Sequence, residues 1–389
     1  MNATACDSAV PALRKRKRAK HLLLGVITSS LALFLALLGA ELGLRVFAPQ
    51  EVAVVRRGLF TPDDTFGYRR APNLNVQINT GERDVWLVTD EKGHRVAKNA
   101  PASDNDAVRV LAVGDSFVEA LSVEYERTFS ALIEAALRRE LNRSVKVVNA
   151  GVGAWEPSHY LLEARRELAD SNYDLVLVCL YLGNDLKPTR SGYFRPAPNN
   201  ARDSFFRIPR RLAAEEFRQS LADPLKSVLE QYSHLYVLAR NVRYTHFELV
   251  DSRKVVQDYA RSGRGASPFD IAADVCADLA KMAGAIPVVF AVIPDHLETF
   301  GETYSDAPES DKLSRPMLEA LEKRGLRTVD LTPALVRAEK QGPSVFGRID
   351  RHFSPRGHEI AAAVITPVVL ERLHAREQER PTAVPSHAP

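Results

Sequence analysis

Residues 108–117 read Val-Arg-Val-Leu-Ala-Val-Gly-Asp-Ser-Phe, an apolar run that ends in a small polar turn. Val108–Val113 has the length and the β-branched composition of a buried strand. Gly114 permits a tight turn after it, and Ser116 follows where the chain leaves the sheet. Glycine, aspartate and serine are also common in ordinary strand-to-helix turns, so this tripeptide alone is weak evidence of chemistry. It does mark the carboxyl end of a first predicted strand.

The alternation of buried strand and amphipathic helix continues toward the C-terminus. Four further apolar runs are predicted strands: residues 145–149, 175–182, 287–293 and 326–329. The helices between them are predicted to begin at capping or first-turn residues: Thr128, Pro157, Ser267, Ser314 and Ser354. Pro367 predicts a kink in the last helix. This pattern predicts an α/β fold, a three-layer α/β/α sandwich around a mostly parallel five-stranded sheet.

A basic and then apolar segment precedes this region. Residues 14–20 carry six Lys or Arg, and Leu22–Ala40 contains no charged residue. A helix of that length spans about 28 Å, close to the thickness of a bilayer's hydrocarbon core. The basic flank predicts a cytoplasmic N-terminus (residues 1–20), a transmembrane anchor (21–45) and a body in the periplasm or outside the cell. A cleaved signal peptide is the alternative, although no clean cleavage site follows the apolar stretch.

Two regions do not follow the alternation of predicted strands and helices. Residues 46–105 combine a linker with short apolar stretches, which predicts a small β-rich lead-in and no separate domain. Residues 188–267 are too long for a loop and carry 14 Lys or Arg against 8 Asp or Glu, a net +6. We predict a partly helical insertion whose charge faces solvent, an anionic substrate or lipid headgroups. It interrupts an α/β domain at 106–374, and a disordered tail is predicted at 375–389.

Charge and cysteine content exclude several classes of protein. The net charge is +3, and residues 1–50 contribute +5 of it, so the body carries about −2 and has no nucleic-acid-binding signature. Cys6, Cys179 and Cys276 have no CxxC spacing, so no metal site is expected. Cys179 and Cys276 are interpreted as buried thiols, and a disulfide between them stays open at this point.

Two turns at later strand ends carry hydrogen-bond donors. In the turn at residues 149–155, Gly153 and Ala154 can direct backbone N–H groups toward an oxyanion. The turn at residues 183–185 reads Gly-Asn-Asp, and its Asn184 can offer a side-chain amide. Because the carboxyl ends of parallel strands meet at one edge of a sheet, these groups are expected to lie near the serine turn.

A histidine in the loop before the last helix completes the set. His352 can act as a base toward a serine, and Asp350 can orient its ring. An isolated Asp-x-His in a loop is more often a surface feature. Four loops at one edge would, however, supply a nucleophile, oxyanion donors, a base and its carboxylate, which are the roles that acyl transfer requires.

In their order and context these blocks resemble the SGNH (GDSL-like) hydrolase family, in its membrane-anchored bacterial type. The resemblance covers about residues 106–374 without the insertion, and it implies a flavodoxin-like fold that needs no metal and no cofactor. It implies Ser116 as nucleophile, His352 as base and Asp350 as the orienting carboxylate. The implied oxyanion donors are Ser116, Gly153, Ala154 and Asn184. The implied supporting residues are Gly114, Asp115, Gly183 and Asp185.

Two positions depart from the family's pattern. The second-block glycine falls at Ala154, which keeps the N–H group but leaves less room for a ligand. The acid–base block often reads Asp-x-x-His, but Ile349 stands three residues before His352. Asp350 is therefore the expected orienter at a shorter spacing, and Asp330, after the fifth strand, is the other option. Structural or surface roles are expected for the remaining histidines near this edge: His159, His296 and His358.

The resemblance implies an ester hydrolase that acts outside the cytoplasm, on O-acyl groups of envelope glycans or lipids. An O-acyltransferase with the same serine is the close alternative, because a sugar hydroxyl can replace water after the acyl-enzyme forms. A non-catalytic carbohydrate-binding or assembly protein is the third option, which the departures at Ala154 and in the Asp–His spacing would permit. The expected partners are an acyl ester or acylated glycan and the membrane, with no nucleic acid.

Overall fold

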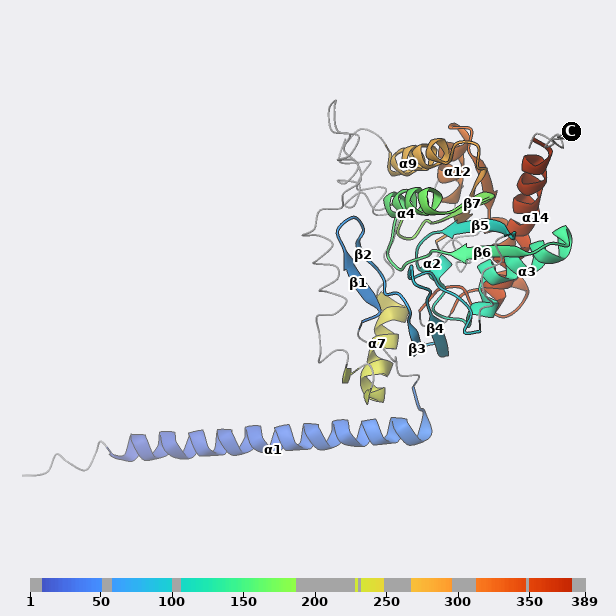
Figure 1. Ribbon diagram of the computed structural model, residues 1–389. Coiled ribbons are helices and arrows are strands. Elements are labelled where there is room, and N and C mark those ends of the chain that lie inside the picture. The colour runs from blue at the N-terminus through green and yellow to red at the C-terminus, as the bar shows by residue number, and fades with distance from the viewer. Residues whose placement is uncertain are drawn as a thin grey trace, which may run out of the picture.

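Five parallel strands form the central sheet of the computed structural model (Figure 1). They are hydrogen-bonded in the order β6-β5-β7-β8-β9. Their bounds are Val108–Val113 (β5), Val145–Asn149 (β6), Leu175–Tyr181 (β7), Val288–Ile293 (β8) and Arg327–Asp330 (β9). Each lies within one residue of a predicted strand, so the predicted α/β class is confirmed. The structure describes residues 9–50, 58–99, 106–186, 228–229, 232–247, 267–295, 313–347 and 350–379.

Helices cover both faces of the sheet, as the strand pattern requires (Figure 1). One face packs against α4 (Pro157–Asp170), α9 (Pro268–Ala283) and α12 (Ser314–Glu322). The other packs against α3 (Phe129–Leu141), α13 (Thr332–Gln341) and α14 (Pro355–Glu379). Alternate side chains of each strand enter opposite layers: in β5, Leu111 and Val113 pack with the first set, and Val110 and Ala112 with the second.

The helix ends follow their capping residues. The Thr128 hydroxyl accepts from the Ala131 N–H at 3.2 Å and starts α3, and Gly284 ends α9 at φ +63°. Two features differ from the sequence prediction. Helix α13 was not predicted, and α14 continues to Glu379 through Pro367, so it includes the first residues of the predicted disordered tail.

The lead-in consists of two antiparallel hairpins packed beside the carboxyl edge of the sheet (Figure 1). Their strands are β1 (Phe60–Asp63), β2 (Gly67–Arg70), β3 (Asn75–Asn79) and β4 (Asp84–Val88). Phe66 stacks on Trp155 with ring centroids 5.1 Å apart. The Arg95 N–H donates to the Asn149 carbonyl at 3.1 Å, which joins the end of the lead-in to β6. These contacts make the lead-in part of the α/β core.

The N-terminal helix α1 (Ala9–Phe47) projects away from this body (Figure 1). An 18-residue window within residues 20–47 has a mean hydropathy of 2.4 and none of it is buried, so this helix is long and apolar enough to cross a membrane. Within the predicted insertion the structure describes α7 (His234–Phe247), which agrees with partly helical character. Most of the insertion and residues 380–389 of the predicted tail lie outside the described residues.

Candidate active site

Ser116 is the first residue of α2 (Ser116–Glu119), a short helix that begins where β5 ends. A Cβ atom at Gly114 would lie 3.1 Å from the Cys179 carbonyl oxygen and would also overlap Val118, so only glycine fits this turn. The Asp115 carboxylate accepts the Phe117 N–H at 2.9 Å and caps the helix. The serine is thereby held at the carboxyl edge of the central strands.

His352 lies directly against Ser116, although 236 residues separate them in the chain. The distance from His352 Nε2 to Ser116 Oγ is 2.7 Å, a hydrogen-bond length. The imidazole packs against the Phe117 ring, with centroids 5.1 Å apart, and the His352 side chain keeps 31% of its surface exposed. The imidazole is therefore fixed by packing on one side and open on the other.

Asp350 is the carboxylate nearest the histidine ring. Its Oδ2 lies 3.7 Å from His352 Nδ1, and its Oδ1 accepts the His352 backbone N–H at 3.1 Å. Arg351, between them, has φ +60°, a left-handed conformation that tightens the loop at this short spacing. Asp330, the other option from the sequence, instead accepts the Thr332 N–H at 2.9 Å at the start of α13.

The lead-in holds Asp350 in place. Thr80, which follows β3, donates its hydroxyl to Asp350 Oδ2 at 2.8 Å, and the Asp350 N–H donates to Glu82 at 3.0 Å. The sequence did not reveal these supports because their partners are about 270 positions away. A polar hairpin turn carries no signal of such a distant partner.

These charges set the protonation of the dyad. Burial alone would lower the pKa of His352, but the hydrogen bond and charge of Asp350, together with the carboxylates of Asp115 and Glu119, raise it above 6.5. Burial would raise the pKa of Asp350, but the contacts with His352 and Thr80 outweigh it and hold the pKa below its usual value. Asp350 is thus anionic at neutral pH, and its charge helps to raise the pKa of the neighbouring His352.

The predicted oxyanion donors lie in the turns around Ser116, and two of them already donate hydrogen bonds within the protein. The Gly153 N–H donates to Glu119 Oε2 at 3.0 Å, so this group is already engaged. Ala154 has φ +62°, so its backbone keeps the left-handed turn that a glycine would adopt more readily. Asn184 donates from Nδ2 to Asp115 Oδ2 at 2.8 Å, which uses one of its two amide hydrogens.

A buried ion pair that the sequence did not predict supports this turn. Arg70 donates from Nε to Glu119 Oε1 at 2.5 Å, and the two side chains are 3% and 2% exposed. The other Glu119 oxygen holds Gly153, so one carboxylate links the lead-in, the serine helix and the glycine turn. A sequence signal did exist: Glu119 is a lone acid among Phe117, Val118 and Ala120, which suggests a buried partner.

Asp115 and Asp185 are two buried carboxylates close to the Ser116 turn. Asp185 accepts the Tyr160 hydroxyl at 3.0 Å and the Tyr181 N–H at 2.9 Å, and burial together with the charge of Asp115 raises its pKa well above the usual value. Burial also raises the pKa of Asp115 to about 6, against the lowering effect of its Phe117 and Asn184 hydrogen bonds. The neighbouring Gly183 packs so closely on the Tyr181 ring that a Cβ would overlap it.

The other histidines and cysteines are structural where they are described. His159 accepts the Glu156 N–H at 3.3 Å and stacks on Trp155. His358 is fully buried and accepts the Phe129 N–H at 3.2 Å, and burial lowers its pKa to about 3. Cys179 and Cys276 are buried free thiols, which removes the disulfide option. His296 and Cys6 lie outside the described residues.

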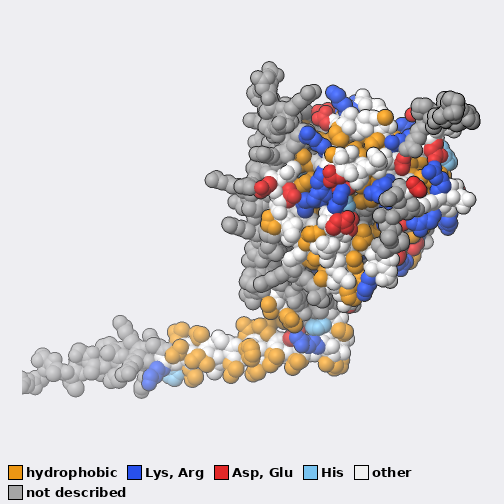
Figure 2. Space-filling view, in the orientation of Figure 1, with side chains coloured by type: hydrophobic (Ala, Val, Ile, Leu, Met, Phe, Trp, Pro, Cys, Tyr) orange, Lys and Arg blue, Asp and Glu red, His pale blue; other side chains and the backbone are white. Residues whose placement is uncertain are grey.

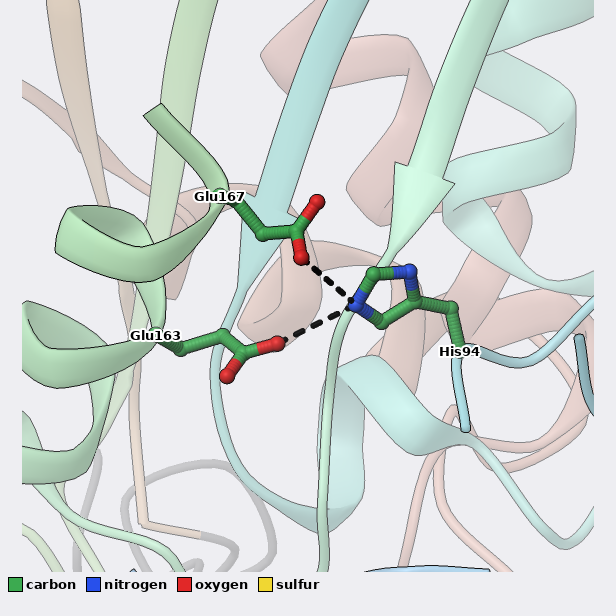
Figure 3. Close-up of side chains that lie close together, drawn as sticks. All are labelled: His94, Glu163 and Glu167. Atoms are coloured by element: carbon green, nitrogen blue, oxygen red, sulfur yellow. Dashed lines mark hydrogen bonds and ion pairs between the residues drawn. The ribbon is translucent and has the colours of Figure 1, made fainter. Parts of the chain in front are cut away.

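A separate cluster has the residue types of a metal site (Figure 3). His94 points at Glu163 and Glu167 of α4, and one possible ligand atom from each lies within 4.8 Å of the others. His94 Nε2 is 3.1 Å from Glu163, while Asp90 faces the other ring nitrogen at 3.4 Å. Burial lowers the pKa of His94, but these carboxylates raise it to about 9, so the ring is a cation.

Further cations already surround the same two glutamates. Arg69 and Arg166 approach Glu163 at 3.2 and 2.8 Å, and Lys92 approaches Glu167 at 3.1 Å. A divalent ion would have to displace these groups and deprotonate the histidine. The cluster is therefore an ion-pair network that fastens the lead-in to α4.

Part of the chain matches a known family model. Residues 261–388 match the model described as "SGNH hydrolase-like domain, acetyltransferase AlgX", a stretch that contains the His352 loop but not Ser116. No curated protein matches the sequence.

Several solved structures are similar at low identity. A G-D-S-L family lipolytic protein from Veillonella parvula is 14% identical, with a TM-score of 0.37, and the match covers 67% of this chain and 98% of that chain. A variant of the acetyl xylan esterase Axe2 from Geobacillus stearothermophilus is 12% identical, with a TM-score of 0.36 and coverage of 68% and 94%. A lipase from a goat rumen metagenome is 13% identical, with a TM-score of 0.38 and coverage of 69% and 97%.

Proposed function

We propose that this chain is a serine-dependent acyl-ester hydrolase of the SGNH hydrolase-like family, whose model matches residues 261–388, and that it acts outside the cytoplasm. The observation that carries the proposal is the 2.7 Å contact between Ser116 Oγ and His352 Nε2. A serine is a weak nucleophile until a base within hydrogen-bond reach can take its proton. The hydrolase domain comprises residues 106–374, with the lead-in as its support.

The reaction proceeds through an acyl-enzyme. Neutral His352 takes the hydroxyl proton as Ser116 Oγ attacks the ester carbonyl, and it then gives that proton to the leaving alcohol. Water attacks the acyl-serine, His352 takes the water's proton, and the carboxylic acid leaves as Oγ is reprotonated. Asp350 stabilises the imidazolium in both halves. The Ser116 and Ala154 N–H groups and the Asn184 amide are the proposed oxyanion donors.

Replacing Asn184 by alanine should lower kcat by about 10²–10³, with a smaller change in KM, because an oxyanion donor acts mainly in the transition state. Steady-state hydrolysis of a short-chain ester measures both parameters. Asn142→Ala, at the end of α3, is a control that leaves the site untouched. An Asn184→Ala enzyme with the wild-type kcat would remove this amide from the oxyanion role.

Asp350→Asn should change the pH profile. His352 must be neutral to act as a base, so kcat/KM rises as pH increases through its pKa, which Asp350 raises. Without that charge the acid limb should move to lower pH, and the plateau should fall by about 10²–10⁴ because the ring loses its orienter. The Asp330→Asn variant should keep the wild-type profile, since Asp330 accepts the Thr332 N–H at the start of α13. An unmoved acid limb in Asp350→Asn would argue against the assignment.

An O-acyltransferase is the second candidate, and the family description, which includes an acetyltransferase, favours it. In that reaction a sugar hydroxyl attacks the acyl-serine in place of water. Incubation with an acyl donor and glycan acceptors separates the two: acylated glycan in excess of free acid indicates transfer, and free acid that is unaffected by acceptor indicates hydrolysis. Envelope glycans or lipids with O-acyl groups are the proposed substrates for either reaction.

The membrane anchor is also a proposal, with α1 as a single span and the N-terminus in the cytoplasm. Because Cys179 and Cys276 are buried, Cys6 should be the reactive thiol of the chain. A membrane-impermeant maleimide should label Cys6 only after the cytoplasmic membrane of spheroplasts is permeabilised. Labelling before permeabilisation would reverse the orientation, and a mature chain lacking residues 1–40 would indicate a cleaved signal peptide.

A further inference from the structure

Helix α7 is fastened to the end of α1 by side chains of α1 itself. Glu41 accepts the Ser233 hydroxyl at 3.0 Å and the backbone N–H groups of His234 and Leu235 at 3.0 and 2.9 Å. One α1 carboxylate thus satisfies the first N–H groups of α7, the position where an anion stabilises a helix. Arg45 pairs with Glu41 at 2.9 Å and donates to the Tyr232 carbonyl at 2.6 Å.

This junction lies at the level where the apolar span ends. Glu41 is the first charged residue after the uncharged stretch Leu22–Ala40, and Arg45 is the next. Charged side chains are costly in the bilayer core, so both belong at the membrane–water interface. Figure 1 shows α7 leaving α1 at a steep angle at this end, on the side of the body. If α1 crosses the membrane, a helix that starts at the interface and lies at a large angle to the α1 axis runs along the membrane surface.

One side of this helical segment is apolar and uncovered. Val228, Tyr232 and Val242 are 51%, 65% and 48% exposed, and Ala239 between them is also exposed. Spacings of four, seven and three residues place these four side chains on one helical side. The periodicity continues across Ser233, because its N–H donates to the Leu229 carbonyl and its own carbonyl accepts from Val237. Val237, on another side, is fully buried against the protein.

Apart from α1, exposed large apolar side chains of the described residues occur only in this stripe of Val228, Tyr232 and Val242. In the space-filling view, apolar side chains cover α1, whereas the visible body surface mixes charged and apolar groups (Figure 2). Within the described residues the stripe therefore begins beside the apolar helix α1, at Tyr232, whose carbonyl accepts from Arg45.

We propose that α7 and the turn before it form an interfacial helix, with Val228, Tyr232 and Val242 inserted at the headgroup–acyl boundary of the bilayer that α1 crosses. The inference rests on the proposed membrane anchor. Aromatic side chains such as Tyr232 are favoured at this boundary, and amphipathic helices bind there through their apolar side. With α1 as one attachment and α7 as a second, the body is held in one orientation at the membrane surface instead of swinging on a single tether.

The test uses the full chain with Cys6→Ser, which leaves only the buried Cys179 and Cys276. Single cysteines introduced by Tyr232→Cys or Val242→Cys carry an environment-sensitive fluorophore. The protein is reconstituted in phosphatidylethanolamine–phosphatidylglycerol vesicles that contain nitroxide at the headgroup or deep in the acyl chain. Headgroup nitroxide should quench both labels at least about twofold more than a label at Glu371→Cys, an exposed site on α14.

Two further variants separate the possible outcomes. A label at Leu31→Cys, within α1, should be quenched by deep nitroxide. If it is quenched while the labels at Tyr232 and Val242 behave like the one at Glu371, the anchor holds and the interfacial helix is refuted. If Leu31 is not quenched, the anchor fails and the inference fails with it. Labels at Tyr232 and Val242 that are shielded from aqueous iodide but not quenched by lipid would mean that a protein surface covers the stripe, which also overturns the inference.

Charge on the stripe supplies the matched functional control. Tyr232→Asp with Val242→Asp, carrying the label at Val228→Cys, should lose lipid quenching and keep wild-type hydrolysis of a soluble short-chain ester, because the substituted side chains are exposed and remote from Ser116. Quenching that survives both charges would show that the stripe does not contact lipid.

Discussion

Replacing Ser116 by alanine should lower kcat for hydrolysis of a short acyl ester by about 10⁴–10⁶, because a nucleophile and its base, the roles proposed for Ser116 and His352, act as a unit. Only the hydroxyl is lost, and its partner His352 is partly exposed, so Tm should remain at the wild-type value. His352→Ala should cost a similar factor, and the double variant should be no slower than either single variant, since neither residue works without the other.

The control for this prediction is a serine at the other end of the sheet. Ser171→Ala removes a serine hydroxyl after α4, at the opposite edge of the sheet, and should leave kcat unchanged. A Ser116→Ala chain that is folded and fully active would refute the nucleophile. A double variant much slower than both single variants would show that the two residues act in independent ways.

Replacing Arg70 by alanine should destabilise the folded body by about 3–5 kcal/mol, the usual cost of removing one partner from a buried ion pair. Arg70 also lies over the Phe60 ring, 4.0 Å from its centroid, so the loss includes packing. The buried Glu119 would lose its ion-pair partner, so the carboxylate that accepts the Gly153 N–H would no longer be held in place by Arg70. We therefore expect slower turnover as well as a lower urea midpoint for the detergent-solubilised chain.

The matched control removes an exposed ion pair. Arg315→Ala breaks a contact with Glu319 whose partners are 62% and 53% exposed, and it should cost at most about 0.5 kcal/mol. Adding Glu119→Gln to Arg70→Ala should recover part of the lost stability, because the uncompensated charge is then gone. Equal midpoints for Arg70→Ala and Arg315→Ala would contradict a structural role for the buried pair.

The sheet was predictable because its signals are local. Each strand is a continuous apolar run bounded by turn residues, so β5 to β9 could be placed within one residue from their composition. The placement of Ser116 after β5 and Asn184 after β7, with His352 in the loop before α14, follows from the same pattern, since parallel strands present their carboxyl ends at one edge. Proximity of Ser116 and His352 could be expected from that placement, whereas their separation of 2.7 Å depends on how the His352 loop folds back over the sheet edge.

The partners of the residues that support the site could not be predicted, because each pairing depends on a distant contact. Arg70 looks like an ordinary polar residue of a hairpin strand, yet it is buried against Glu119, and Thr80 reaches Asp350 across 270 positions. Gly153 illustrates the same limit: the sequence offered its N–H as an oxyanion donor, but Glu119 takes it. Hydrophobic alternation and turn residues predict whether a segment forms a strand, helix or turn. They do not predict which buried charged residue its side chains will contact.

The central claim is that His352 activates Ser116 for covalent acyl transfer, and labelling with a fluorophosphonate tests it most directly. Peptide mapping of the labelled full chain should find a single adduct on Ser116, formed much more slowly in His352→Ala. A folded wild-type chain that takes no label, or that is labelled on another residue, would contradict the account.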